Sequence, residues 1–265
     1  YRGRRWAEKL RYHPIRISTY ITSRCSLKCQ TCPYQREGAE SALHYADMDL
    51  GTFKRILSKF PAACSVTVTG EGEPLLNPAF PAMVRYAEKR GMGASTSTNG
   101  LAFHVVSPRE LGALPLAQIN VSLDAPNATA YTNIRGSGLQ FEDALRGVEA
   151  LVAAKKEQHS QVCIRISHVV TQGNYGNIPD FIRLGDDLGV DKICFHNVTA
   201  FGTPMSRPED CLYRDGPVQK FFFEVAEQFF EIGGRASSRR QIEWPVLYGR
   251  GGPERICLQP FSTIG

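Results

Sequence analysis

Hydrophobic and polar positions follow two alternating periods along most of the chain. Short β-branched and apolar runs predict strands, and apolar residues spaced three or four apart predict amphipathic helices. The runs that predict strands are 15–21, 65–69, 94–98, 119–123, 162–170 and 192–197. The stripes that predict helices are 50–60, 80–87, a short segment after Ser107, 141–154, 178–188 and 218–232. The pattern therefore predicts strands and helices in strict alternation.

Local residues mark the ends of two of these helices. Asp49 stands just before the first helix, where its carboxylate is suited to accept a hydrogen bond from a free backbone amide. Asn77 and Pro78 supply an N-cap and a first-turn proline for the second helix, and Gly91 and Gly93 end it. These residues agree with the boundaries that the periodicity indicates.

Alternating strands and helices favour a parallel sheet with right-handed crossovers, and so a barrel-like or a doubly wound α/β fold. Six strand–helix units fall within residues 15–235, and residues 1–14 precede them as an N-terminal extension. Residues 236–265 are richer in Gly, Pro and Arg and show no closing element. We interpret this last segment as the start of a second module that is incomplete in this chain.

The composition is that of an ordinary globular protein. Hydrophobic residues make up 42% and charged residues 22%, which argues against disorder and against a fibrous repeat. No stretch approaches the roughly 20 apolar residues of a membrane span, and no apolar block follows the N-terminal arginines as it does in a signal peptide. We therefore expect a cytoplasmic protein without a membrane partner.

The net charge of +5 is concentrated in the segments 2–11 and 235–240. Nucleic-acid binding proteins combine a basic stripe with exposed aromatic residues or a recognition motif, and no such motif is present here. We interpret these segments as solvated basic surface and expect no nucleic-acid partner.

Three of the eight cysteines form a cluster, whereas a disulfide scaffold in a chain this long would need more of them. Cys25, Cys29 and Cys32 have the spacing C-x3-C-x2-C directly after the first predicted strand. Soft thiolate ligands suit iron–sulfur clusters, and three ligands for four irons leave one iron open to a small molecule. The alternatives are a structural zinc site, which needs a fourth ligand such as His44, and a ferredoxin-like cluster, which needs a fourth cysteine.

This cysteine loop after the first strand of a βα series resembles that of the radical SAM superfamily. The resemblance implies an α/β fold, a partial (βα)6 TIM-like barrel, with a short C-terminal extension of twitch or SPASM type. It implies a [4Fe–4S] cluster with one open iron site, held by Cys25, Cys29 and Cys32, and S-adenosylmethionine (SAM) as the molecule that chelates that iron. Reductive cleavage of SAM then produces a 5′-deoxyadenosyl radical that abstracts hydrogen. The family often has an aromatic residue before the third cysteine, where this chain has Thr31, and Tyr34 is the substitute we consider.

Two loops resemble the family's SAM-binding loops. Gly72, Glu73 and Pro74 follow the second strand, where a glycine allows close approach and a carboxylate or carbonyl accepts hydrogen bonds from the methionyl amino group. Thr98 and Asn99 end the third strand and are suited to meet the ribose. An ordinary glycine turn and an ordinary polar turn are the alternatives.

Segments 121–125 and 131–136 resemble the branch of the family that carries a SPASM or twitch domain. That branch implies that Ser122 and Arg165 contact the SAM carboxylate, with Arg165 directed into the barrel if Ile164 and Ile166 face the helices. We interpret Arg135 as part of a structural ion pair. Asp124 is a candidate catalytic residue facing the substrate, and the alternative is that it caps the following loop.

Two further cysteines have candidate roles. Cys257, followed by Pro260 and Phe261, resembles the first ligand of an auxiliary iron–sulfur cluster, although the later cysteines of such a module are missing. Cys211 lies in a polar segment and is a candidate cluster ligand or hydrogen-atom donor.

We expect the enzyme to abstract hydrogen from a small polar substrate of carbohydrate or aminocyclitol type, leading to oxidation or epimerisation. Peptide-modifying relatives often carry an N-terminal leader-recognition domain, and only 14 residues precede the first predicted strand here. A maturase that modifies a ribosomally synthesised peptide is the alternative, and an iron–sulfur electron-transfer protein without SAM chemistry is the alternative from another class. The electron is expected from a reductant protein such as flavodoxin or ferredoxin.

Overall fold

The computed structural model describes residues 13–34, 46–136, 140–198, 241–243 and 263–264. Six strands of the predicted positions are present: β1 (Arg16–Tyr20), β2 (Ser65–Thr69), β3 (Gly93–Thr98), β4 (Leu116–Ser122), β5 (Cys163–Val170) and β6 (Lys192–Asn197). The helices are α1 (Leu50–Ser58), α2 (Phe80–Lys89), α3 (Pro108–Ala113), α4 (Ala128–Arg135), α5 (Phe141–Glu157) and α6 (Ile178–Leu188), with short 3-10 turns η1 (Pro74–Leu76) and η3 (Tyr175–Asn177). Two short strands, β7 (Gln241–Glu243) and β8 (Thr263–Ile264), lie at the sheet edges. The predicted helix 218–232 lies outside the described residues.

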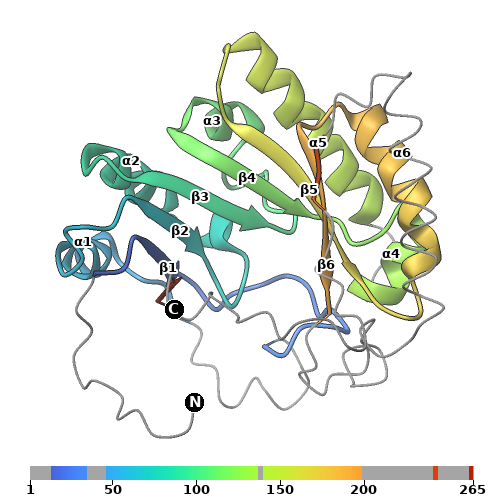
Figure 1. Ribbon diagram of the computed structural model, residues 1–265, viewed down its shortest axis with the longest axis horizontal. Helices are drawn as coiled ribbons and strands as arrows, with labels where there is room; N and C mark the ends of the chain where they lie inside the picture. The colour runs from blue at the N-terminus through green and yellow to red at the C-terminus, as the bar shows by residue number, and fades with distance from the viewer. Residues whose placement is uncertain (1–12, 35–45, 137–139, 199–240, 244–262, 265) are drawn as a thin grey trace, which may run out of the picture.

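The strands form one sheet in the order β7-β6-β5-β4-β3-β2-β1-β8, and every neighbouring pair is parallel. In a doubly wound fold the strand order reverses at one point, whereas in a barrel each new strand adds to the same edge. The six main strands here follow the barrel order (Figure 1). The predicted α/β partial barrel is therefore confirmed, and the doubly wound alternative is wrong.

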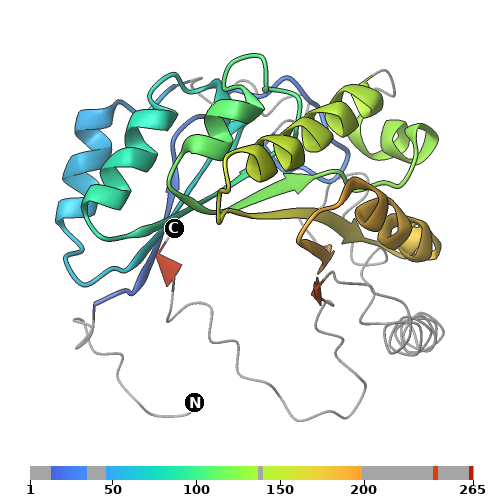
Figure 2. The ribbon, with the colours of Figure 1, turned by 90° about the horizontal axis from the view of Figure 1, so that it is seen from above.

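The two faces of the sheet differ in their surroundings. Helices α1, α2, α3, α5 and α6 lie together on one face (Figure 2). Residues such as Val66 and Val68 point to that face and are fully buried. Ile164 and Ile166 also lie there, which is the condition stated for an inward Arg165, so Arg165 between them is directed to the other face.

Hydroxyl, amide and charged side chains occupy this other, inner face. The residues concerned are Thr67, Ser95, Ser97, Asn120, Ser122, Arg165 and Ser167. Because side chains alternate between faces along a strand, the apolar positions that build the core leave a polar row on the inner side. Side chains of this row line the cavities described below.

Asp49 caps α1 as predicted, since its Oδ1 accepts a hydrogen bond from the Thr52 amide over 2.8 Å. The assigned α2 begins at Phe80, later than predicted, but Asn77 Oδ1 accepts from the Ala79 amide over 2.8 Å, as an N-cap side chain does. The Asn77 side chain also donates to the carbonyls of Ile21 (2.7 Å) and Met48 (3.0 Å). It therefore joins the end of β1 to the segment that leads into α1.

The sequence reading also missed α4, an additional helix between β4 and α5. Asn127 caps it by accepting from the Ala130 amide over 2.9 Å, and Gly136 ends it with a left-handed φ of 85°. Within the part of the chain that the structure describes, no helix combines the length and the apolar character needed to traverse a bilayer.

Candidate functional site

The carboxyl ends of the strands surround a cavity of about 420 Å³, which we call the cysteine pocket. Cys25, Cys29 and Cys32 line it, together with the loop after β2 and the ends of β3, β4, β5 and β6. In parallel α/β folds this edge of the sheet carries the ligand site. The structure thus brings the predicted cysteine loop and both predicted cofactor loops to one cavity.

Gly72 joins the loop after β2 to the start of the cysteine loop. A Cβ atom at this position would lie 2.0 Å from the Arg24 carbonyl oxygen, a distance no side chain tolerates. The Gly72 amide donates to Thr22 O (3.2 Å), and the Glu73 amide donates to Arg24 O (2.7 Å). Glycine is required here so that the two backbones can touch directly before Cys25.

Arg24 anchors the cysteine loop from its other side, a contact that the sequence reading missed. Its guanidinium forms an ion pair with Asp47 at 2.6 Å and also donates to the Leu76 carbonyl. Asp47 additionally accepts from the Thr22 hydroxyl over 2.7 Å. The strand end, the segment before α1 and the η1 turn are therefore tied together around this arginine.

Glu73 connects the two predicted cofactor loops. Its Oε1 accepts from the Thr98 hydroxyl (2.8 Å) and the Leu75 amide (3.2 Å), and its Oε2 accepts from the Asn99 amide (2.6 Å). Burial raises the pKa of Glu73 to about 7, and the hydrogen bonds from Asn99 and Thr98 oppose this shift. The carboxylate therefore fixes the loop after β3 against the loop after β2. Pro74 is buried in η1, behind this contact.

Hydrogen-bond donors surround two of the three cysteine sulfurs. Cys25 Sγ accepts from the Leu27 amide (3.4 Å) and from Asn99 Nδ2 (3.8 Å), and Cys29 Sγ accepts from Arg135 Nη1 (3.4 Å). Burial raises the pKa of Cys25 to about 11 and also raises that of Cys29, which Arg135 opposes. Such donors stabilise a thiolate once a metal replaces its proton.

Arg135 forms the buried ion pair that we predicted for it. Its Nη2 lies 2.5 Å from Asp124 Oδ2 and donates to the Ser122 carbonyl over 2.6 Å. The side chains of Arg135 and Asp124 are 8% and 6% exposed. Burial alone would lower the pKa of Arg135, but the Asp124 carboxylate raises it, so the guanidinium is permanently charged.

Asp124 lines the cysteine pocket with its backbone in the left-handed region at φ 60°. Its Oδ1 accepts from the Val169 amide over 2.8 Å, and its Oδ2 belongs to the Arg135 pair. Both carboxylate oxygens thus have protein partners. The expected contact of Asp124 with a substrate stays a prediction, and the loop-fixing alternative accounts for the contacts present.

Arg165 points inward but does not line the cysteine pocket, so its contact with the SAM carboxylate stays a prediction. Its Nη1 donates to Gln118 Oε1 (3.1 Å), and its Nη2 lies 3.4 Å from Glu243 Oε2. Arg165 is the third residue of β5, near the amino end of the sheet, whereas the cofactor loops lie at the carboxyl end. Ser122, in contrast, does line the cysteine pocket, with its Oγ 3.3 Å from Ser97 Oγ.

The remaining candidates divide into two groups. Thr31 and Tyr34 line the cysteine pocket. Cys211, Cys257 and His44 lie outside the described residues, so their proposed ligand or donor roles stay predictions.

The donor set of the cysteine pocket fits an iron–sulfur cluster. Among the residues that the structure describes, no three His, Cys, Asp or Glu side chains converge as ligands of one ion would. A cubane does not require such convergence, because each thiolate binds a different iron. Three thiols on one loop, with N–H donors directed at two of them, are the ligands such a cluster takes.

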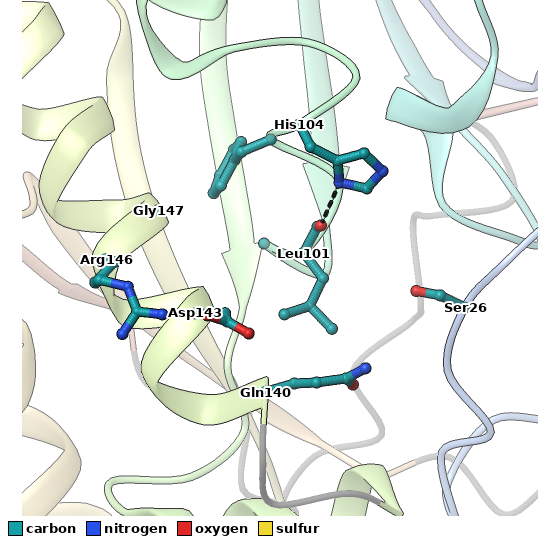
Figure 3. A pocket seen from close by; sticks show the side chains of 9 residues that line it. Ser26, Leu101, His104, Gln140, Asp143, Arg146 and Gly147 are labelled. Carbon is teal, nitrogen blue, oxygen red and sulfur yellow. Dashed lines mark hydrogen bonds and ion pairs between the residues drawn. The ribbon is translucent and has the colours of Figure 1, made fainter.

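A second hollow, of about 490 Å³, lies beside the cysteine loop, between the loop after β3 and the start of α5 (Figure 3). Ser26, which follows Cys25, lies at its rim, and His104 Nδ1 contacts the Leu101 carbonyl over 3.2 Å. Gln140 Oε1 is buried there, and no described residue forms a hydrogen bond with it. Its lining carries Asp143 and Arg146, which pair with each other, so no excess charge marks this hollow for a ligand.

Comparison with known proteins agrees with this geometry. The family profile of the Radical SAM superfamily matches residues 19–184. The tungsten-containing aldehyde ferredoxin oxidoreductase cofactor-modifying protein of Pyrococcus furiosus is 33% identical over 245 residues, which cover 89% of this chain and 64% of that protein. The mycofactocin maturase MftC of Mycobacterium ulcerans is 30% identical over 179 residues, which cover 66% of this chain and 45% of MftC. The chain therefore spans less than two thirds of the length of either relative.

Solved structures share the fold. SuiB of Streptococcus suis bound to S-adenosylmethionine has a TM-score of 0.65 at 15% identity, covering 90% of this chain and 51% of SuiB. SuiB bound to its precursor peptide SuiA has a TM-score of 0.64, also at 15% identity, covering 90% of this chain and 50% of SuiB.

Proposed function

Because the chain belongs to the radical SAM superfamily, we propose that it is an enzyme that binds a [4Fe–4S] cluster through Cys25, Cys29 and Cys32 and cleaves SAM reductively. Bound together, the cluster and SAM supply a 5′-deoxyadenosyl radical that abstracts a hydrogen atom from the substrate. One observation carries the proposal: the cysteine loop and the loops after β2 and β3 line a single cavity of about 420 Å³.

The loop after β2 is proposed to receive the methionyl amino group of SAM. Gly72 brings this loop against the cysteine loop. The loop lines the cysteine pocket, so its backbone carbonyls and the Glu73 carboxylate are the proposed hydrogen-bond acceptors. Thr98 and Asn99 are proposed to lie beside the ribose, with their positions fixed by Glu73.

The SAM carboxylate is proposed to bind between Ser122 and Arg135. Arg165, the arginine that the resemblance indicated, borders a different cavity, whereas Arg135 lines the cysteine pocket. Arg135 Nε is buried and has no partner among the described residues, so one N–H donor remains available for a carboxylate oxygen.

For the substrate, we propose a peptide rather than a small carbohydrate. The two curated relatives carry the names of a maturase and a cofactor-modifying protein, which support the alternative named in the sequence analysis. SuiB has been crystallised with a precursor peptide, so this fold accommodates a peptide in that protein. Oxidation or epimerisation of a small polar substrate has no support in these relatives. A reductant protein such as flavodoxin or ferredoxin, and an auxiliary cluster at Cys257, also stay proposals.

The first test is anaerobic reconstitution with iron and sulfide, followed by dithionite and SAM. We expect an electron paramagnetic resonance signal of a reduced cluster that changes when SAM is added, and formation of 5′-deoxyadenosine. Cys29→Ser should abolish both. Cys64→Ser is the matched control, because Cys64 is exposed and lies outside the cysteine pocket.

A reduced cluster that forms no 5′-deoxyadenosine would overturn the proposal and favour an electron-transfer protein. Once cleavage is established, deuterium transfer from labelled candidate peptides into 5′-deoxyadenosine identifies the substrate. Transfer from a labelled carbohydrate instead would reject the peptide.

A further inference from the structure

The inner face of the sheet contains another cavity, of about 570 Å³, which we call the inner-face cavity. Residues of β1, β2, β3, β4 and β5 line it from the amino half of the strands, and Glu243 of β7 closes one side. Ser97 and Asn120 line both this cavity and the cysteine pocket. The two spaces therefore adjoin along the polar row of the inner face.

The lining carries hydrogen-bonding groups where a sheet interior is usually apolar. Thr67 Oγ1 lies 3.3 Å from Ser95 Oγ, and Asn120 Nδ2 donates to Ser97 Oγ and Ser167 Oγ, each over 3.0 Å. These contacts leave Asn120 Oδ1 buried, with no hydrogen-bond partner in the part of the chain that the structure describes. A buried acceptor without a partner is costly, and a ligand donor at this point would remove that cost.

The charges of the cavity are unbalanced. Among the described residues that line the cavity, Arg16 and Arg165 face a single carboxylate, that of Glu243. Glu243 is shared, since it lies 3.4 Å from Arg165 Nη2 and also 3.3 Å from Lys192 Nζ. Arg165 Nε is buried without a hydrogen-bond partner among the described residues, and Arg16 makes no ion pair with any of them. One guanidinium charge is therefore left for an anionic ligand.

We propose that the inner-face cavity binds the substrate and selects a peptide segment that carries a carboxylate. The Arg165 guanidinium, with Arg16 at the rim, binds that carboxylate. Asn120 accepts a hydrogen bond from the part of the peptide nearest the cysteine pocket. The inference rests on the proposed function, because a radical formed in the cysteine pocket reaches only a carbon that lies directly beside it.

The volume and the lining agree with this occupant. About 570 Å³ is within the range of pockets that enclose a drug-sized ligand, which is the size of a short peptide segment. Hydroxyl and amide groups pair with peptide N–H and C=O groups without distinguishing sequence, so the arginines supply the selectivity.

The test uses the cluster-loaded, SAM-bound full chain and two probe peptides, acetyl-Gly-Glu-Gly-amide and acetyl-Gly-Gln-Gly-amide. Isothermal titration calorimetry should show the Glu peptide binding on the order of tenfold more tightly than its uncharged counterpart. Arg165→Gln should reduce this preference to about twofold or less. Arg183→Gln, which removes an equal charge from exposed α6, should keep it.

Arg16→Gln is a second variant, for the case that Arg165→Gln does not fold, because Arg16 is exposed. It should also weaken the preference for the Glu peptide over the Gln peptide. Equal affinity of the wild-type protein for both peptides, or a preference that survives both cavity variants, would overturn the inference. If the wild-type protein forms no 5′-deoxyadenosine, the proposed function fails instead. Calorimetry therefore tests the inference about the cavity, and 5′-deoxyadenosine formation tests the proposed function.

Discussion

Arg135 Nη1 donates a hydrogen bond to Cys29 Sγ over 3.4 Å, so a permanently charged guanidinium lies beside one proposed cluster ligand. The end of α4 delivers this arginine, because the Gln30 amide donates to the Ile134 carbonyl over 2.8 Å and so joins the cysteine loop to the helix. Residues more than a hundred positions apart thereby form one unit.

This contact predicts an effect on the reduction of the cluster. A positive donor at a ligating sulfur stabilises the added electron, so Arg135→Gln should make the reduction potential more negative. Redox titration of the reconstituted protein, followed by electron paramagnetic resonance, measures the shift at equal iron content. Arg146→Gln, which removes an exposed charge on α5, is the control and should leave the potential unchanged. A potential that stays constant or rises in Arg135→Gln contradicts the prediction.

The Arg135–Asp124 pair should also dominate local stability, because both side chains are buried. Arg135→Gln alone leaves the Asp124 carboxylate buried without its cation, and we expect a loss of about 3–5 kcal/mol in the free energy of unfolding. Asp124→Asn alone should cost a similar amount. The double variant should lose clearly less than the sum, since neither charge is then left unpaired.

Urea denaturation of the metal-free protein measures all three variants. The exposed Arg146–Asp143 pair is the comparison, and Arg146→Gln should change stability by less than about 0.5 kcal/mol. If the double variant loses as much free energy of unfolding as the two single variants together, Arg135 and Asp124 do not act as a pair.

Gly72→Ala should damage the base of the cysteine loop. The added Cβ would meet the Arg24 carbonyl at 2.0 Å, so the two backbones must separate, and we expect a loss of about 1–3 kcal/mol in stability together with lower iron retention. Gly176→Ala is the matched control, because no atom of the described residues lies within 4 Å of a Cβ at that position. Equal behaviour of the two variants would show that the close approach at Gly72 has no structural importance.

Glu73 predicts a particular pH dependence of the metal-free protein. Its pKa is about 7 in the folded state against an ordinary value of 4.5, so the folded state binds more protons between these two values. The contribution of Glu73 to stability is therefore fully present below pH 4.5 and is lost as the pH rises to about 7. Above that pH the contribution is constant.

The measurement is the free energy of unfolding against pH for the wild-type protein and for Glu73→Gln. Their difference isolates Glu73 from His168, whose pKa is lowered by burial and which acts in the opposite direction. We expect the wild-type protein to lose stability relative to the variant between pH 4.5 and 7. If the stability of the two proteins changes with pH in the same way over this interval, the prediction for Glu73 is wrong.

Local pattern was enough to predict the six strands and the cysteine loop, but it left a barrel-like and a doubly wound fold open, and the family resemblance indicated the barrel. Strand period, helix period and the spacing of Cys25, Cys29 and Cys32 are properties of short segments. They can be read from the sequence because each strand or helix turns its apolar side to the core, whatever its neighbours are. The Asp49 cap is local for the same reason. Alternation along β5 linked an inward Arg165 to Ile164 and Ile166 facing the helices, and the structure meets that condition.

Only the tertiary structure decided how far along the barrel each inward residue lies. Strand alternation assigns a side chain to a face of the sheet but not to a position along the barrel axis. The register of β5 with β4 puts Arg165 opposite Asn120, farther from the carboxyl ends of the strands than the cofactor loops are. The same holds for Asn77, whose amide reaches carbonyls of two distant segments, and for Gly72, whose necessity depends on the Arg24 backbone. These relationships join parts of the chain that are far apart in sequence, so no single segment carries them.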